Sequence, residues 1–144
     1  MTKHDDCIFC KIIDGEIPSA KVYENEHVYA FLDISQVSKG HTLVIPKKHT
    51  RNIYDTPAEV SKNLFEAVPR IARAIRQAYE PDGLNILNNN EAAADQSVFH
   101  LHIHLIPRYT GVEGYRPIWN THEKDYTPED LQKIAAHIQS AIDA

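Results

Sequence analysis

The chain has 144 residues, 42% of them apolar and 24% charged, a balance typical of one compact globular domain and not of a disordered segment. A net charge of −5 argues against binding along a nucleic-acid backbone, which depends on many Lys and Arg contacts to phosphates. The start MTKHDDCIFC is too charged for a signal peptide, and no stretch approaches the ~18 apolar residues of a membrane span. We expect a single domain over residues 1–144, located in the cytoplasm, with no nucleic-acid partner and no membrane partner.

Three segments in the first third of the chain have the alternating pattern of β-strands. They are residues 21–23, 27–34 and 42–45, each rich in β-branched or aromatic side chains. Asn25-Glu26 suits a tight hairpin turn, and Gly40 can take positive φ in the next connection. These strands are expected to pair antiparallel.

A helix is predicted from residue 57 to about residue 79. Thr56 is expected to cap it, with Pro57 in the first turn and Glu59 completing a capping box. Pro69 predicts a kink. The apolar positions that recur every three or four residues are Leu64, Val68, Ile71 and Ile75.

The second half of the chain contains two more strands and a last helix. Residues 84–88 and 98–106 are the predicted strands, and Thr127-Pro128 opens the helix. Its apolar stripe is Leu131, Ile134, Ile138 and Ile142. Because strands and helices do not strictly alternate, the expected class is α+β on an antiparallel sheet.

The strongest functional signal is the alternation of His100, His102 and His104 with aliphatic residues. Alternate residues of a strand point to one face, so the three imidazoles are expected to share a face while the aliphatic residues face the core. A neutral imidazole can attack phosphorus, with protonated neighbours stabilising the phosphate oxygens. Three imidazoles can alternatively bind a catalytic Zn²⁺ that activates water. The spacing alone leaves both chemistries open.

Cys7 and Cys10 are the only cysteines, and they have Cys-x-x-Cys spacing. A structural disulfide between them is not expected in a reducing cytoplasm. The spacing is compatible with a redox pair, with half of a zinc site or with no function.

The run QSVFHLHIHLI at residues 96–106 resembles the signature of the histidine triad (HIT) superfamily, specifically its histidine triad nucleotide-binding branch. Residues 7–13, 31–34 and 41–49 resemble further family segments in the same order, so the resemblance covers most of the chain. It implies an α+β HIT fold with a five-stranded antiparallel sheet, a long central helix and a C-terminal helix.

The resemblance also implies roles for individual residues. His102 matches the nucleophile, while His104 and Ser97 match residues that hold phosphate oxygens and His100 completes the catalytic set. Gln96 and Asn89 resemble polar residues on the phosphate side. The matching base pocket is apolar and consists of Ile8, Phe9, Ile12, Phe31, Leu32 and Ile34. Asp33 is then expected to accept hydrogen bonds from the ribose hydroxyls.

A structural zinc is the only cofactor that the resemblance implies, and no organic cofactor is expected. Its ligands are Cys7, Cys10, His49 and His100. A closed Cys₂His₂ set leaves no open position, so this zinc is expected to anchor the N-terminal segment without activating water. Lys47, Lys48 and Arg51 are interpreted as a solvated basic patch.

The implied activity is that of an adenosine 5'-monophosphoramidase-like nucleotide hydrolase or nucleotidyl transferase, acting as a homodimer. It cleaves the α-phosphate linkage of purine nucleoside phosphoramidates or related conjugates through a nucleotidyl-histidine intermediate. Dinucleoside polyphosphate hydrolysis and a non-catalytic nucleotide sensor or partner-binding module remain alternatives. One loop departs from the family pattern, because Glu91 and Asp95 stand where glycines are usual. Positive φ is costly for such residues.

Overall fold

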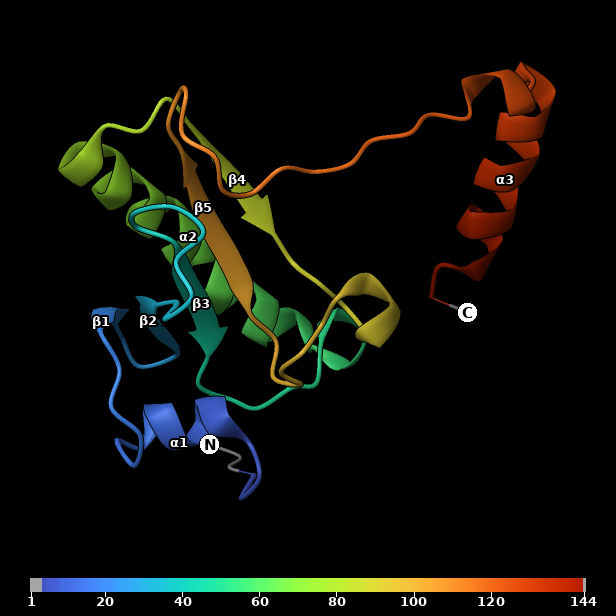
Figure 1. Ribbon diagram of the computed structural model, residues 1–144. Coiled ribbons are helices and arrows are strands. Elements are labelled where there is room, and N and C mark those ends of the chain that lie inside the picture. Colours follow the sequence, from blue (N-terminus) through green and yellow to red (C-terminus); the bar gives the residue numbers. More distant parts are fainter. Residues whose placement is uncertain (1–3, 144) are drawn as a thin grey trace.

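A computed structural model describes residues 4–143 (Figure 1). Its helices are α1 (Ile8–Ile13), α2 (Ala58–Tyr79) and α3 (Pro128–Ala141), and its strands are β1 (Lys21–Glu24), β2 (Val28–Leu32), β3 (Thr42–Pro46), β4 (Gly83–Leu87) and β5 (Ile103–Arg108). Short 3-10 helices span Ile53–Asp55, Ala92–Ala94 and Glu123–Asp125. The α+β class and both expected helices are confirmed, whereas the sequence did not predict α1.

The strands form one antiparallel sheet in the order β1-β2-β3-β5-β4. The β1–β2 hairpin turns on Asn25, whose Oδ1 accepts from the backbone N–H groups of His27 and Val28 at 2.8 Å each. Gly40 has a φ of 98°, as its loop predicted. β3 is the central strand, and β5, which carries His104, lies between β3 and the edge strand β4.

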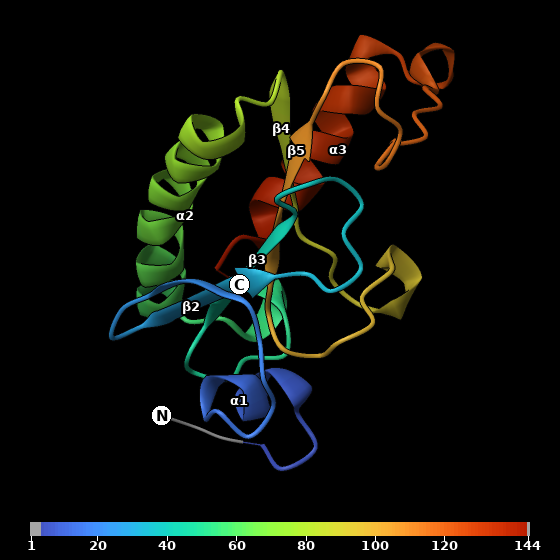
Figure 2. The ribbon, with the colours of Figure 1, turned by 60° about the vertical axis from the view of Figure 1, so that its left-hand side comes forward.

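Alternate strand residues build two separate cores. One face packs on the apolar stripe of α2, and this core contains Val28, Ala30, Val44, Leu64, Ala67, Val68, Ile71, Ile75, Leu101, Ile103 and Leu105. The other face packs on α1 through Cys7, Phe9, Cys10, Ile12, Tyr29, Phe31, Leu43 and Ile45. Figure 2 shows α2 along one side of the sheet and α1 near its lower end. The histidines belong to the α1 side.

Thr56 does not cap α2, so that prediction is wrong. Pro57 occupies the cap position without a side-chain hydrogen bond. The Thr56 hydroxyl instead donates to the backbone oxygen of Asn52 at 2.6 Å, which closes the preceding turn. Pro69 lies inside α2 and does not end it.

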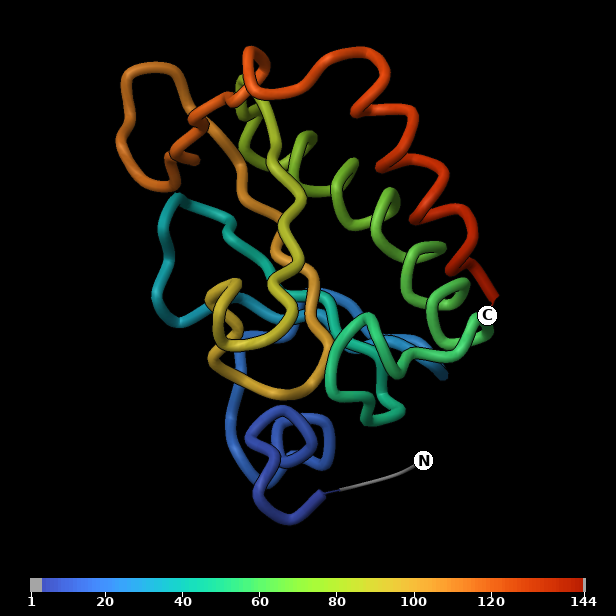
Figure 3. Tube along the Cα trace, turned by 90° about the vertical axis from the view of Figure 1, so that its right-hand side faces the viewer, coloured from blue at the N-terminus to red at the C-terminus, as the bar shows by residue number. Residues whose placement is uncertain are grey.

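The predicted start of α3 is confirmed. Thr127 Oγ1 accepts from the Asp130 N–H at 3.1 Å, and Asp130 Oδ2 accepts from the Thr127 N–H at 2.9 Å. The single chain nevertheless leaves the apolar stripe of α3 in solvent, since no residue of this helix is buried. Figure 1 shows α3 apart from the sheet and α2, and Figure 3 follows the chain through the segment after β5 to this last helix. Among residues 4–143, no helix combines the length and apolar character that a membrane crossing needs.

Candidate active site and metal centre

The histidine segment keeps its alternation, although its strand begins later than predicted. β5 starts at Ile103, so residues 98–102 approach the sheet as irregular chain. The aliphatic residues of the segment are buried against α2. The rings of His102 and His104 are neighbours on the opposite side, with centroids 5.1 Å apart. His100 lies on the same side, since its ring also contacts Phe9 of α1, but it is 0% exposed and contacts Cys7, so the three imidazoles divide between two neighbouring groups.

His102 has one ring nitrogen with no hydrogen-bond partner in the part of the chain that the structure describes. Its Nδ1 lies 2.7 Å from the backbone oxygen of His100. Because a carbonyl oxygen can only accept, Nδ1 carries the proton and the neutral ring keeps its lone pair on Nε2. Within residues 4–143, every fully buried side-chain N or O atom has a partner, whereas Nε2 has none. Nε2 therefore reaches the surface and can attack an electrophile.

His104 is linked to His41 and, through it, to a carboxylate. His104 Nδ1 lies 2.9 Å from His41 Nε2, and His41 Nδ1 accepts the Val37 N–H at 3.4 Å. With His41 Nδ1 accepting, its Nε2 donates to His104, whose own proton then sits on Nε2. Asp33 Oδ2 stands 3.7 Å from His41 Nε2. The result is an N–H group of His104 that can donate to an anionic oxygen.

The three ligand atoms of Asp33, His41 and His104 lie within 4.8 Å of one another, which makes them a possible metal group. The hydrogen bond between His41 and His104 accounts for their closeness without an ion. We therefore treat this group as part of the hydrogen-bonded site.

Burial shifts the pKa values of the three histidines of the segment in the same direction. It lowers the pKa of His100 and of His104 to about 4, and it lowers the pKa of His102 below its ordinary value of 6.5. All three rings are therefore neutral at pH 7. The expected protonated neighbours are not present in the free protein, where His104 can act only as a neutral donor.

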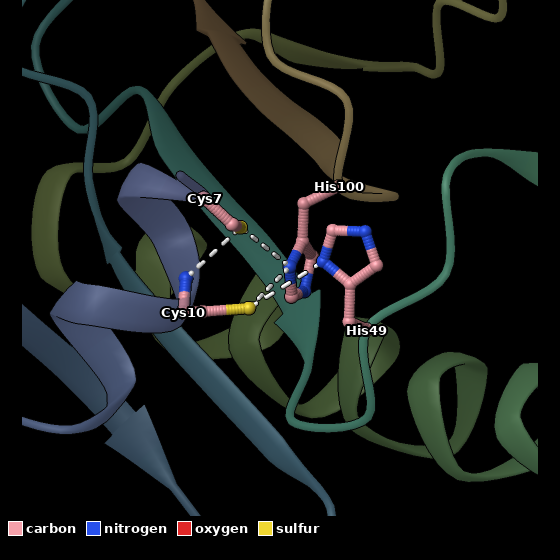
Figure 4. A group of neighbouring side chains, drawn as sticks. All are labelled: Cys7, Cys10, His49 and His100. Carbon is pink, nitrogen blue, oxygen red and sulfur yellow. Dashed lines mark hydrogen bonds between the residues drawn. The ribbon is translucent and has the colours of Figure 1, made fainter. Parts of the chain in front are cut away.

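Cys7, Cys10, His49 and His100 converge at the end of α1 (Figure 4). Cys7 Sγ lies 3.3 Å from His100 Nδ1, while Cys10 Sγ lies 3.6 Å from the same atom and 3.4 Å from His49 Nδ1. All four potential ligand atoms lie within 4.8 Å of one another. The sequence therefore predicted this group correctly as a spatial cluster.

The geometry of this cluster fits a tetrahedral zinc ion. Zn–S bonds of about 2.3 Å and Zn–N bonds of about 2.0–2.1 Å place S and N ligands about 3.5 Å apart in a tetrahedron. The observed S···N distances of 3.3–3.6 Å match this value. The Nε2–H of His100 donates to the Pro46 oxygen at 2.8 Å, which leaves Nδ1 as the ligand atom. Burial raises the pKa of the Cys7 thiol to about 11, so the thiol remains protonated unless a cation compensates the thiolate charge.

The residues expected to form the base pocket separate into buried and exposed groups. Phe9 and Phe31 are in edge-to-face contact at 5.4 Å, and the ring centroid of Phe9 lies 5.2 Å from that of His102. Ile12 belongs to the same core, and Leu32 and Asp33 are half-buried at the end of β2. Ile8 and Ile34 are exposed, Ile34 to 99%. The structure therefore brings Phe9, with Phe31 packed against it, to the His102 ring and leaves Ile34 in solvent.

The expected phosphate-side residues lie in the connection between β4 and β5. The Gln96 side chain is fully used, since its Nε2 donates to the backbone oxygens of Arg51 and Val98 and its Oε1 accepts from the Glu91 N–H. Ser97 is exposed and Asn89 is half-buried. In this geometry Gln96 holds the loop that carries Ser97, while direct contacts of these residues with phosphate remain predictions.

Sequence reasoning missed two features that shape the site. The helix α1 is only six residues long, too short for a periodic signal, and the sulfur of Cys7 caps it by accepting from the Cys10 N–H at 3.2 Å. Arg51 was read as part of a solvated patch but pairs with Glu91. In the sequence, the sign that pointed to this pair was Glu91 at a position where the family usually has glycine.

The fold and the paired imidazoles define a class of α+β domains that carry a histidine row on the central strands of a sheet. The model of the HIT domain family matches residues 14–111. The chain is 63% identical over 138 residues to the protein hit of Bacillus subtilis, covering 96% of this chain and 95% of the relative. It is 44% identical over 120 residues to an adenosine 5'-monophosphoramidase of Saccharomyces cerevisiae, covering 83% and 73%. The chain belongs to the HIT domain family.

Solved structures agree with this assignment. A crystal structure of a HIT family member from Bacillus subtilis superposes with a TM-score of 0.93 at 62% identity, covering 95% of this chain and 97% of that one. A zinc-bound histidine triad family protein from Mycobacterium smegmatis superposes with a TM-score of 0.73 at 39% identity, covering 94% and 97%. The five-stranded HIT fold implied by the sequence is confirmed.

Proposed function

We propose that the protein cleaves the α-phosphate linkage of purine nucleoside phosphoramidates or related nucleotide conjugates, with His102 as the nucleophile. The observation that carries this proposal is the tautomer of His102, which is fixed by the hydrogen bond from Nδ1 to the His100 oxygen and leaves Nε2 free. The monophosphoramidase activity named for the yeast relative supports the choice of substrate class.

The reaction divides into two displacements at phosphorus. His102 Nε2 forms a bond to the α-phosphorus while the P–N bond to the leaving amine breaks, and the amine departs with a proton from solvent. Water then attacks the same phosphorus, which releases the nucleoside monophosphate and restores the neutral ring. The His104 Nε2–H is a donor for a phosphate oxygen, and its link to His41 sets the orientation of that donor.

The experiment that tests this function is intact-mass analysis of a rapidly quenched reaction with an adenosine phosphoramidate. The wild-type protein should carry an added mass of one AMP unit minus water, and His102→Ala should carry none. An AMP adduct that persists in His102→Ala assigns the attack to another residue. AMP release without any adduct in the wild type removes the covalent mechanism.

The alternatives give different results in the same assay. A dinucleoside polyphosphate hydrolase releases AMP faster from a dinucleoside substrate than from the phosphoramidate. A non-catalytic nucleotide sensor binds AMP but releases none above the rate in buffer. His102 Nε2 has no partner within residues 4–143, which favours the catalytic reading because an accessible lone pair serves attack better than binding.

We propose that zinc occupies the cluster of Cys7, Cys10, His49 and His100. Support comes from the tetrahedral spacing of the donors and from the zinc-bound relative in Mycobacterium smegmatis. When bound, zinc supplies a structural crosslink between α1, the segment after β3 and the segment before β5. The backbone oxygen of His100 in turn receives the Nδ1–H of His102, so this crosslink also orients the nucleophile.

We infer that the protein is a homodimer in which a second copy covers the apolar stripe of α3. Leu131 is 55% exposed and Ile138 is 61% exposed in the single chain. The edge strand β4 is also open, with Ile86 54% exposed. Light scattering should give twice the mass of one chain, and the double variant Leu131→Glu, Ile138→Glu should give one. A wild-type monomer at micromolar concentration contradicts the dimer.

A further inference from the structure

The connection between β4 and β5 is held in a backbone shape that its own sequence does not favour. Glu91 has φ 75° and ψ 157°, a region that is almost restricted to glycine. Asp95 has φ 68°, also in the left-handed half of the map. Non-glycine residues keep such conformations only where the surrounding structure fixes them. The contacts of this connection are therefore needed to keep its backbone in this conformation.

Arg51 is the main contact of the Glu91 side chain. Its Nη2 and Nε lie 2.7 and 3.2 Å from Oε1 and Oε2, and Asn52 Nδ2 donates to Oε2 at 2.7 Å. The Arg51 hydrogen bond is the largest cause that lowers the pKa of Glu91 to about 2, so the pair stays ionised at any pH where the protein works. The Arg51 guanidinium also lies 4.2 Å from the ring centroid of Phe99. One side chain thus connects the β4–β5 connection with the start of the histidine segment.

Gln96 extends this contact into the interior. Its Oε1 accepts from the Glu91 N–H at 2.8 Å, and its Nε2 donates to the Arg51 oxygen at 2.8 Å and to the Val98 oxygen at 3.1 Å. Gln96 is 4% exposed, so water does not compete for these bonds. Because Ser97 is the next residue, its backbone is fixed on both sides.

A second series of hydrogen bonds leads from the same segment to the nucleophile. Asn90 Oδ1 accepts from the Ile53 N–H at 2.8 Å, and Asn90 Nδ2 donates to Asn88 Oδ1 at 2.6 Å. Asn88 Nδ2 donates to the backbone oxygen of His102 at 3.0 Å. Glu91 directly follows Asn90, so a change in the Glu91 backbone displaces the first member of this series.

We propose that Arg51 and Glu91 form a positioning pair for catalysis, an inference that rests on the proposed function. The pair holds the β4–β5 connection in its unfavoured shape, and the connection in turn holds the backbone of His102 and the loop that carries Ser97. Neither member of the pair needs to touch the substrate. The carboxylate that stands at a usual glycine position therefore serves the site by binding Arg51 and does not face the phosphate.

The test distinguishes the effect of losing the Glu91 carboxylate from the effect of the positive φ at residue 91. Glu91→Gly removes the carboxylate and accepts the positive φ, Glu91→Ala removes the carboxylate and keeps the backbone penalty, and Arg51→Met removes the charge but keeps an apolar stem against Phe99. Glu91→Gly and Arg51→Met should each lower kcat about 10- to 100-fold, since small misplacements of reacting groups have effects of this size. The Kd for AMP should stay within about twofold, and Arg51→Lys should recover part of kcat.

The double variant Arg51→Met, Glu91→Gly provides the sharpest readout. Because the two residues act as a unit, its kcat should equal that of either single variant and not the product of the two losses. Raising the ionic strength should lower kcat of the wild type and leave kcat of the double variant unchanged, since the pair is half-exposed and screened by salt. The matched control is Glu24→Gln, which breaks the exposed pair with Lys47 at the far edge of the sheet and should leave kcat unchanged.

Hydrogen exchange of the amides of residues 91–96 keeps the test independent of turnover. Exchange should accelerate by the same factor in Glu91→Gly and Arg51→Met. The proposal is overturned if these amides exchange as in the wild type, or if they exchange faster while kcat does not change. If the wild type itself lacks turnover, the proposed function fails, and the exchange rates together with AMP affinity still decide whether the pair orders the connection.

Discussion

His100 and His102 lie two residues apart in the same alternating segment, yet their surroundings are opposite. Both nitrogens of the His100 ring are engaged, Nε2 by the Pro46 oxygen at 2.8 Å and Nδ1 by the two thiols at 3.3 and 3.6 Å. Only Nδ1 of His102 has a partner among residues 4–143, the His100 oxygen at 2.7 Å. The first ring has no nitrogen left for another partner, whereas the second keeps one lone pair.

This difference shows that residue type and spacing do not set the role of an imidazole. The role depends on what each of its two nitrogens meets, because the group bound to one nitrogen decides what the other can do. The two rings are also coupled, since the backbone oxygen of the closed histidine fixes the tautomer of the open one. The Cys₂His₂ cluster and the His102 ring therefore share a single peptide segment.

The largest effects are expected when each of the two histidines is replaced by alanine in turn, because the two variants should lose different properties. His102→Ala should lower kcat for AMP release by at least about 10⁴-fold, as the loss of a nucleophile does, and should leave the protein folded. His100→Ala should instead lower the free energy of unfolding. Urea unfolding and steady-state kinetics on both variants check this. Equal loss of kcat and equal stability in the two variants would mean that the roles are not divided.

The next largest effect is the loss of stability expected when a bound metal is removed. Treatment with a strong chelator at neutral pH should lower the free energy of unfolding by about 4 kcal/mol or more, because loss of a bound metal belongs to the most damaging changes. Zn²⁺ should restore the stability of the wild type but not of Cys10→Ser. The same chelation should not remove AMP binding from the protein that remains folded. Unfolding curves that coincide with and without chelator contradict a structural metal.

The sequence predicted the sheet, both long helices and the four members of the Cys₂His₂ cluster, because alternation, capping residues and family motifs are local signals. It did not predict α1, whose single turn and a half has no periodicity, or the engagement of Thr56 by the preceding turn. It also could not foresee that Arg51 meets Glu91, since that contact joins two loops 40 residues apart. Contacts between loops depend on the assembled fold and leave little trace in local pattern.

The pH dependence of kcat/KM tests the surroundings of His102. Burial lowers the pKa of His102 below 6.5, with the His100 oxygen and Asp33 acting in the opposite direction. The ring must be neutral to attack, so kcat/KM should be constant from pH 8 down to about 6.5 and fall about tenfold per pH unit only below the lowered pKa. Initial rates measured in buffers of constant ionic strength show this fall of kcat/KM at low pH. A midpoint at or above pH 6.5 contradicts the structural direction of the shift.

The smallest expected effect is at Ser97, an exposed residue of the connection between β4 and β5. The residue is exposed, so Ser97→Ala should change the free energy of unfolding by no more than about 0.5 kcal/mol. Loss of one hydroxyl donor to a phosphate oxygen should lower kcat about tenfold, the size of one net hydrogen bond. Ser97→Thr keeps the donor and should retain most of the activity. If Ser97→Ala keeps the wild-type kcat, the hydroxyl does not contact the phosphate, and His104 with backbone groups must account for its stabilisation.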